Sequence, residues 1–452
     1  MNQDLRGVPV STDNSAALAS YEKALTQLQS YVGDPIATLD AALAESPDFT
    51  MGHVFKGFAL FTQSEMALVP AVEAALADAK RGEARANDRE RALMLALQRF
   101  VDGDWHGGCQ LLDRVLVTHP RDILAIQVAH LMDFYRGDAQ NLRNRVSRVL
   151  PHWNVSLPGY SYVLGMHAFG LEEMNQYSEA EATARRALEL QPRDAWAVHA
   201  VTHVMEMQGR IDEGVAWLES RHDDWAPENV FAFHNWWHLA LFYMDRADWA
   251  RALALYDAHI HPGPMQFALP LVDATALLWR LTLEGVDVGA RFKTVADEWE
   301  ARLPADRGFY AFNDVHAIIA LVAAGRDFAA TQLLAEIETA ASRSGTNAMM
   351  SRDVGLPLAK GILAFGRGRY VDSIAAIEPM RDHAHRFGGS HAQRDLITLT
   401  LIEAALRSGQ NTLARHYIAE RTTHKPVGAW GRRLARRASE SKPVGVGAAL
   451  ND

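Results

Sequence analysis

The chain repeats a short turn signal at nearly even intervals along most of its length. Each signal joins two helix-like segments, as in "DGDW", "QGRI", "AGRD" and "SGQN", and the central residues are 34 to 43 residues apart. These central residues are Gly103, Gly137, Asn175, Gly209, Ala247, Gly285, Gly325, Gly368 and Gly409. A period of this size is typical of a helical solenoid, because a single helical hairpin cannot bury its apolar face without a neighbour.

Each unit contains a helix, a turn, a second helix and usually a proline stop. The stretch 165–193 resembles the tetratricopeptide pattern, since Tyr177 follows the turn, Ala180 and Ala187 permit close helix packing, and Pro192 ends the unit. Strand signals are nearly absent. The pattern therefore predicts an all-α, tetratricopeptide-like superhelix, a solenoid of about nine helical hairpins.

The regular pattern covers the middle of the chain better than its ends. Residues 1–90 are predicted to be N-terminal capping helices, because the turn is blurred by "SEMALVPAVEAAL". Residues 91–421 form the predicted superhelix. Residues 422–452 gain Gly, Pro, Ser and charge, which predicts a short C-terminal helix and a loose tail.

Composition narrows the classes of function. A net charge of −10 argues against nucleic acid as a partner, and no apolar run approaches the roughly 20 residues needed to span a bilayer. The single cysteine, Cys109, excludes an intrachain disulfide and a thiolate-rich metal site. We therefore expect a cytoplasmic protein with no membrane segment.

Several histidines are predicted to lie on the concave side of the superhelix. In tetratricopeptide geometry the first helix of each hairpin lines this surface, and residues three or four apart share one face. "AVHAVTHVMEMQGR" thereby places His199, His203 and Glu206 in the groove. "FNDVHAIIALVAAGR" places His316 there, preceded by Asp314.

The stretch "FHNWWHLALFYMD" divides between the groove and the core. His234, Trp237 and His238 are predicted to face the groove, with Asn235 beside them. The residues predicted to pack inside the superhelix are Trp236, Leu239, Ala240 and Tyr243. This unit follows the one that carries His199 and His203, so the two histidine pairs are expected on adjacent groove positions.

The residue types in the groove suit acid/base chemistry on a polar or anionic ligand, because a histidine oriented by a carboxylate can transfer protons near neutral pH. The residues predicted to be catalytic are His203, His238, Glu206 and His316. The residues predicted to bind the ligand are His199, His234, Trp237, Asn235, Asp314, His391 and Arg394.

A metal site is an alternative use of the same residues. His199 and His203 are spaced i, i+4, so they can bind one ion from one helix face, and His234 or His238 could complete the set. Ala200 stands where zinc hydrolases with HExxH carry the glutamate base. We therefore predict no cofactor, with zinc or iron as the less favoured alternative.

Four stretches together resemble the tetratricopeptide repeat protein 38 family: "VHAVTHVMEMQGR", "FHNWWHLALFYMD", "FNDVHAIIALVAAGR" and "GSHAQRDLITLTLIEAAL". The resemblance implies an all-helical repeat fold in a cytosolic protein and no particular activity.

Three functions stay open. The first is a His-rich concave pocket for a small polar or anionic ligand or a short peptide, with or without acid/base or hydrolytic catalysis. The others are a scaffold that binds a protein segment in the groove, and a zinc- or iron-dependent enzyme.

Overall fold

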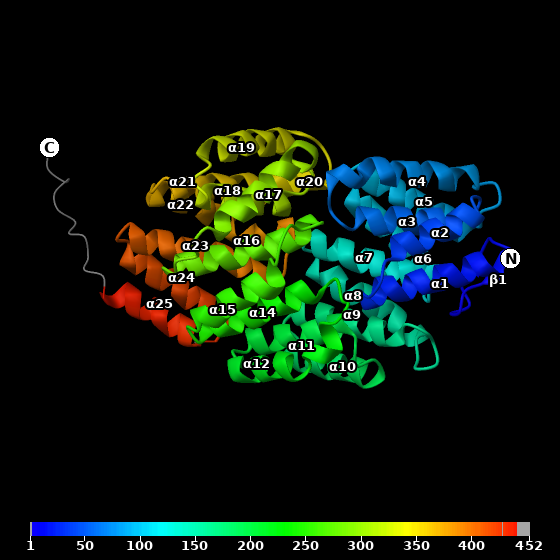
Figure 1. Cartoon of the computed structure of the whole chain (residues 1–452), viewed down its shortest axis with the longest axis horizontal. Helices are drawn as coiled ribbons and strands as arrows, with labels where there is room; N and C mark the ends of the chain where they lie inside the picture. The colour runs from blue at the N-terminus through cyan, green and yellow to red at the C-terminus, as the bar shows by residue number, and fades with distance from the viewer. Residues whose placement is uncertain (1, 427, 441–452) are drawn as a thin grey trace.

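The protein is an all-α stack of helical hairpins, as predicted. The computed structural model describes residues 2–426 and 428–440, so residues 441–452 of the predicted tail lie outside the described residues. The chain runs from α1 at one end of the long axis to α25 at the other, with the hairpins arranged around the centre (Figure 1). A two-stranded ribbon of β1 (Asn2–Gln3) and β2 (Pro9–Val10) precedes the helices.

The hairpins follow one another in chain order, and the two helices of each hairpin pack together. The first helices are α1 (Ser15–Ser30), α3 (Thr50–Phe61), α5 (Asp88–Val101), α7 (Ile123–Tyr135), α9 (Tyr160–Glu173), α11 (Ala195–Met207), α14 (Ala232–Asp245), α16 (Ala268–Leu283), α18 (Ala311–Ala323), α21 (Leu356–Gly366) and α23 (His391–Arg407). The second helices are α2 (Pro35–Glu45), α4 (Val69–Arg81), α6 (Trp105–Thr118), α8 (Ala139–Val149), α10 (Tyr177–Leu190), α12 (Ile211–Ser220), α15 (Trp249–Leu255), α17 (Arg291–Asp306), α19 (Asp327–Ser342), α22 (Tyr370–Ile377) and α24 (Asn411–His424).

Short helices and irregular turns join or extend the hairpins. The α-helical ones are α13 (His222–Trp225), α20 (Thr346–Met350) and the terminal α25 (Ala429–Glu440). The 3₁₀ segments are η1 (Met66–Leu68), η2 (Leu150–His152) and η5 (Glu378–Phe387). The π-helical segments are η3 (Tyr256–Ile260) and η4 (Ser351–Gly355), which continue α15 and precede α21.

The nine predicted turn residues share one backbone conformation. Each has a positive φ, between 59° and 81°, including the two that are not glycine, Asn175 and Ala247. A residue in this left-handed region ends a helix and lets its last carbonyls accept hydrogen bonds from the turn. The aspartate that follows several of these turns then caps the next helix; Asp104 and Asp138, for example, accept hydrogen bonds from the first turns of α6 and α8.

The hairpin pattern also extends through the N-terminal region, where the sequence showed no clear repeat. Tyr31 and Ser64 have φ of 58° and 59° after α1 and α3, and so occupy the same turn position. They lie 33 residues apart, and Ser64 lies 39 residues before Gly103. The spacing is therefore regular, but the signal was hidden because neither residue is a glycine.

The superhelix closes on itself. α23 packs against both α11 and α16, which come from hairpins far earlier in the chain. Trp279 Nε1 on α16 donates to Thr400 Oγ1 on α23 at 3.0 Å. The Arg280 guanidinium donates to the carbonyl oxygens of Ala392 and Gln393 at 2.7 and 3.0 Å. The concave faces of these first helices are consequently interior surfaces.

A second contact joins the region of α5 to α7 to the region of α17 to α20, which lies beside α4 and α5 in Figure 1. The backbone N–H of Thr346 donates to the Gly103 carbonyl at 2.9 Å, and Thr346 Oγ1 accepts from the N–H of Trp105. Tyr310 donates its hydroxyl proton to the carbonyl of Tyr135 at 3.0 Å. These bonds join segments that are 175 to 243 residues apart in the chain.

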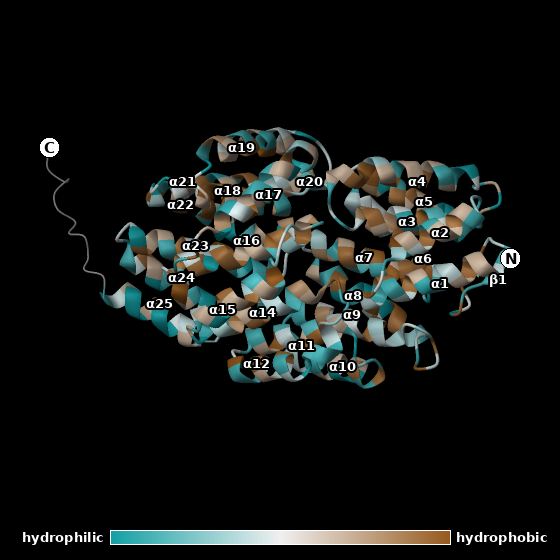
Figure 2. Ribbon diagram, viewed as in Figure 1, coloured by the Kyte–Doolittle hydropathy of each residue, from teal (hydrophilic) through white to brown (hydrophobic). Residues whose placement is uncertain are grey.

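Helices at the centre of the molecule are more hydrophobic than helices at its periphery. Figure 2 shows the central α7 mostly brown and the peripheral α25 mostly teal, and nearly all residues of α7 are buried. Within the described residues, no helix is both long and apolar enough to cross a membrane.

The left-handed turns generate a first prediction. Gly325 has a φ of 72° and nothing within 4 Å of an added Cβ, so Gly325→Ala tests the backbone conformation alone. We expect the substitution to lower the free energy of unfolding by about 1 kcal/mol, because an L-residue is disfavoured there. Gly263→Ala is the matched control, since that site is equally open and its φ is not in the left-handed region. Equal midpoints of urea unfolding for the two variants would contradict this account.

Candidate functional site

Four histidines from two adjacent first helices meet inside the protein. α11 carries His199 and His203, and α14 carries His234 and His238, each pair one helical turn apart. One ring nitrogen from each residue lies within 4.8 Å of those of the others, and all four residues are buried. We call this set the histidine cluster. The sequence placed these residues on adjacent groove positions; the closed superhelix has made that part of the groove interior.

Two rings of the histidine cluster are held by carboxylates. His234 Nδ1 donates to Asp273 Oδ2 on α16 at 2.5 Å, and His238 Nδ1 donates to Glu206 Oε2 on α11 at 2.9 Å. In both rings this leaves Nε2 as the nitrogen available to the other histidines. A carboxylate on the far side of an imidazole fixes its tautomer and orientation and makes the remaining nitrogen a stronger ligand.

His203 has a third carboxylate beside it. Its Nδ1 lies 3.4 Å from Glu172 Oε2 on α9, and both side chains are fully buried. Burial, together with the neighbouring Glu173 carboxylate, raises the pKa of Glu172 well above its usual value. Glu172 therefore lies in the position that Asp273 and Glu206 occupy at the other rings, at a longer distance.

Several polar atoms of this region have no hydrogen-bond partner within the described residues. They are both ring nitrogens of His199 and of His203, Nε2 of His238, and both carboxyl oxygens of Glu172. An unpartnered buried donor or acceptor costs roughly 1–3 kcal/mol, and most buried polar groups in proteins are paired. Such a concentration in one place calls for a functional explanation.

Three rings of the histidine cluster favour their neutral form. Burial lowers the pKa of His203 to about 4 and that of His238 to about 3. Burial and the neighbouring histidines lower the pKa of His199 well below its usual value. Neutral imidazole has a free nitrogen lone pair, which is the form that binds metal ions.

Glu206 connects the histidine cluster to the C-terminal part of the chain. Its Oε1 accepts a hydrogen bond from Lys425 Nζ at 2.9 Å, while Oε2 accepts from His238. Burial alone would raise the pKa of Glu206, but the Lys425 ammonium and the His238 hydrogen bond hold it well below its usual value. Glu206 is thus a buried carboxylate that stays ionised.

The ligand-binding residues predicted on α23, His391 and Arg394, make their hydrogen bonds to Glu173 and not to the four histidine rings. The backbone N–H of His391 and the Arg394 guanidinium donate to Glu173 at 2.9 and 3.2 Å. The ring Nε2 of His391 donates to the Glu173 carbonyl at 3.0 Å. Through these bonds the two residues join α23 to the C-terminal end of α9.

Two other predicted residues lie outside the histidine cluster. His316 Nδ1 donates to the Phe312 carbonyl at 2.8 Å within α18, and burial lowers the pKa of His316 to about 4. Asp314 accepts from the backbone N–H of Gly308 at 3.0 Å, and burial raises the pKa of Asp314 to about 7. Both are buried and have local structural partners.

α14 is buried on more than one face, so its side chains do not divide between core and groove as predicted. Trp237 is fully buried, stacked on His234 with ring centroids 5.3 Å apart and lying under the Arg280 guanidinium at 5.2 Å. Trp236 is only half-buried and stacks on His259. Asn235 donates to the Ala195 carbonyl at 3.4 Å. Trp237 and Asn235 therefore support the positions of the histidines.

The sequence pointed to Glu206, but not to Asp273 and Glu172 beside two other rings, nor to Lys425, which pairs with Glu206. Asp273 interrupts the apolar run "LPLVDATALLW", and an acidic residue in such a run is a signal for a buried, paired charge. Glu172 and Lys425 carry no comparable local signal, because their contacts come from segments distant in sequence.

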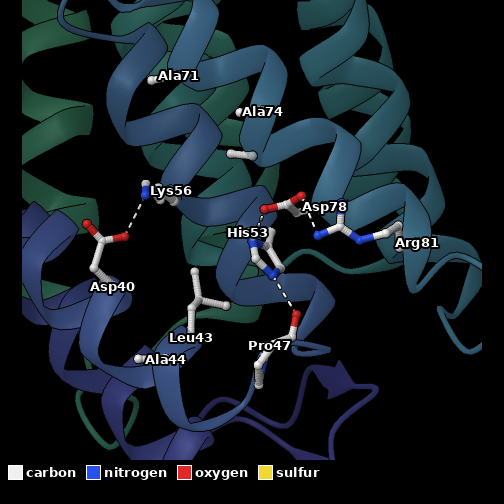
Figure 3. Close-up of a pocket in the computed structure, with 11 residues that line it drawn as sticks. Asp40, Leu43, Ala44, Pro47, His53, Lys56, Ala71, Ala74, Asp78 and Arg81 are labelled. Carbon is white, nitrogen blue, oxygen red and sulfur yellow. Dashed lines mark hydrogen bonds and ion pairs between the residues drawn. The ribbon is translucent and has the colours of Figure 1, made fainter.

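A separate surface cavity of about 390 Å³ lies between α2, α3 and α4 (Figure 3). Lys56 pairs with Asp40 and Arg81 pairs with Asp78 on its walls. His53 Nε2 donates to the Pro47 carbonyl at 2.8 Å. The charged groups of this cavity largely satisfy one another, and none of them belongs to the histidine cluster.

Comparison with solved structures finds helical-repeat proteins at low identity. A tetratricopeptide repeat protein from Parabacteroides merdae is 12% identical and matches 62% of this chain and 99% of its own, with a TM-score of 0.36. Cut9 in the APC/C hetero-tetramer Cut9–Hcn1 is 12% identical over 94% of this chain and 76% of its own, with a TM-score of 0.44. The human IFIT1 dimer with m7Gppp-AAAA is 11% identical over 95% of both chains, with a TM-score of 0.43.

No family model matches the chain. The tetratricopeptide-like assignment rests on the hairpins and left-handed turns of this structure, and the particular family that the sequence resembles stays a prediction. A helical repeat of this kind supports a binding or scaffolding role without naming a ligand.

The Lys425–Glu206 pair generates a second prediction. Lys425→Met should lower the free energy of unfolding by about 3 kcal/mol, because removing one partner leaves a buried charge uncompensated. Lys360→Met is the matched control: Lys360 pairs with Glu338 at 2.8 Å, but both side chains are about half exposed, and we expect less than about 1 kcal/mol. Thermal or urea unfolding at pH 7 measures both. Similar losses for the two variants would show that Lys425 does not compensate a buried charge.

Proposed function

We propose that this protein binds one divalent transition-metal ion through His199, His203, His234 and His238. The observation that carries the proposal is the convergence of four buried imidazoles whose ring nitrogens lie within 4.8 Å of one another. A bound ion would accept the lone pairs that have no partner in this interior. It would thereby remove the desolvation cost that the unpartnered nitrogens otherwise impose.

The donor set narrows the choice of ion. Four imidazole nitrogens suit zinc and iron(II), as well as copper, cobalt and nickel, whereas magnesium and calcium prefer oxygen ligands. Tetrahedral coordination with zinc–nitrogen bonds of about 2.0–2.1 Å places neighbouring nitrogens about 3.3 Å apart. The rings would therefore need to approach one another by no more than about 1.5 Å.

The charges around the four rings also favour a cation. Asp273 and Glu206 accept hydrogen bonds from the far sides of two rings. Proteins commonly orient a metal-binding histidine with a carboxylate that accepts a hydrogen bond from its other ring nitrogen. The predicted groove for a peptide or protein segment is less well supported, because His199, His203 and His238 are at most 2% exposed.

Metal content tests the proposal directly. Protein purified without chelator, or reconstituted with zinc or cobalt(II) and then desalted, should hold about one equivalent per chain by elemental analysis. His203→Ala and His238→Ala should each hold less than about a tenth of an equivalent. His53→Ala is the control, because His53 is buried in the separate cavity. Wild-type protein that retains no transition metal after reconstitution would rule the proposal out.

The carboxylate behind His234 provides a further test. Asp273→Asn should weaken zinc affinity by about 10- to 100-fold while leaving one equivalent bound at saturation, because the ring loses its orienting anion. Competition with a chromogenic chelator measures the change. Asp257→Asn is the matched control, since Asp257 pairs with Arg291 on the surface. If both variants bind zinc as tightly as the wild type, Asp273 does not orient a ligand.

A further inference from the structure

His199 differs from the other three residues of the histidine cluster. The other rings each have a carboxylate beside Nδ1, at 2.5, 2.9 and 3.4 Å. Both nitrogens of His199 are buried without a hydrogen-bond partner, as are those of His203, but His199 has no carboxyl group beside it. No neighbouring carboxyl group orients its ring, which makes His199 the weakest of the four candidate ligands.

Aromatic rings surround His199 where the other histidines have carboxylates. The ring centroids of Phe169 and Trp196 are each 5.1 Å from that of His199, and the centroid of Phe231 is 5.2 Å away. Tyr31 packs against Phe231, with ring centroids 5.1 Å apart. These four aromatic residues form what we call the aromatic wall.

Solvent exposure differs among the rings of the histidine cluster and of the aromatic wall. The side chains of His203 and His238 are fully buried, whereas that of His234 is 9% exposed. Phe231, which contacts both His199 and His234, is half-buried and follows the exposed Val230. Phe231 thus connects the rings of His199 and His234 to a partly exposed part of the structure.

From these observations we infer that His199 is a displaceable ligand and that the position it occupies admits a small, planar, neutral donor molecule. This inference rests on the metal binding proposed above. Two histidines oriented by hydrogen bonds to carboxylates, a third beside a carboxyl group and one exchangeable position resemble the three-ligand set of catalytic zinc sites more than a closed structural site. The histidine cluster would accordingly be a binding centre for an external ligand.

The aromatic wall defines the chemical class of that ligand. Flat aromatic surfaces favour planar apolar molecules through offset or edge-to-face contacts. None of Phe169, Trp196 and Phe231 carries a charge that could neutralise an anion. An unsaturated nitrogen-containing ring of the size of imidazole matches the His199 side chain in shape and in donor atom, so it is the simplest ligand of this class.

The experiment uses cobalt(II), whose visible absorption reports its ligands, and imidazole as the probe. His199→Gly should still bind about one equivalent of cobalt(II), with an altered spectrum, whereas His203→Gly should bind less than about a tenth. Imidazole should bind saturably to cobalt-loaded His199→Gly and restore a spectrum like that of the wild type. With the wild type, excess imidazole should change the cobalt spectrum without removing the metal.

The outcomes separate this inference from the proposed function. Loss of cobalt from His199→Gly to the same extent as from His203→Gly would overturn the inference and indicate four equivalent ligands. A wild-type cobalt spectrum unaffected by imidazole would also overturn it, whether or not His199→Gly folds. A wild type that takes up no cobalt would instead refute metal binding itself. Circular dichroism and unfolding midpoints identify a variant that has lost its fold.

Discussion

The packing of α23 against α11 and α16 turns a groove into an interior. In an open superhelix the concave side of the first helices faces water, and polar side chains on it carry little cost. Here Arg280 on α16 donates to the backbone of α23, and Glu173 on α9 accepts from the start of α23. Once the surfaces meet, every polar group on them must find a partner in the protein or in a ligand.

Most of the buried charges have found such partners. Glu206 pairs with Lys425, and Glu173 pairs with Arg394, so both carboxylates remain ionised inside the protein. The histidine cluster is the exception, because ring nitrogens of His199 and His203 and the Glu172 carboxyl are buried without hydrogen bonds. Residues selected for stability alone would be apolar at such positions. The retained polarity is the physical reason for assigning a ligand to this place.

The fold could be read from the sequence where glycine or asparagine marks the turns, because only a few residue types adopt positive φ without strain. Ala247 was recognised through its spacing from neighbouring turns. Tyr31 and Ser64 adopt the same conformation but gave no signal, so the N-terminal hairpins were predicted only as capping helices. Neither the closure of the superhelix nor the docking of α23 was predicted, since both depend on the accumulated rotation between hairpins.

For the site, the sequence by itself determined that His199 and His203, and likewise His234 and His238, share one helix face, because the helical repeat fixes neighbours three or four residues apart. It also placed both pairs on adjacent hairpins. Only the tertiary structure decided that the four rings are buried and that Asp273 and Glu172 lie behind two of them. Local periodicity determines the direction of a side chain on its own helix, whereas the partner it meets depends on packing between segments distant in the chain.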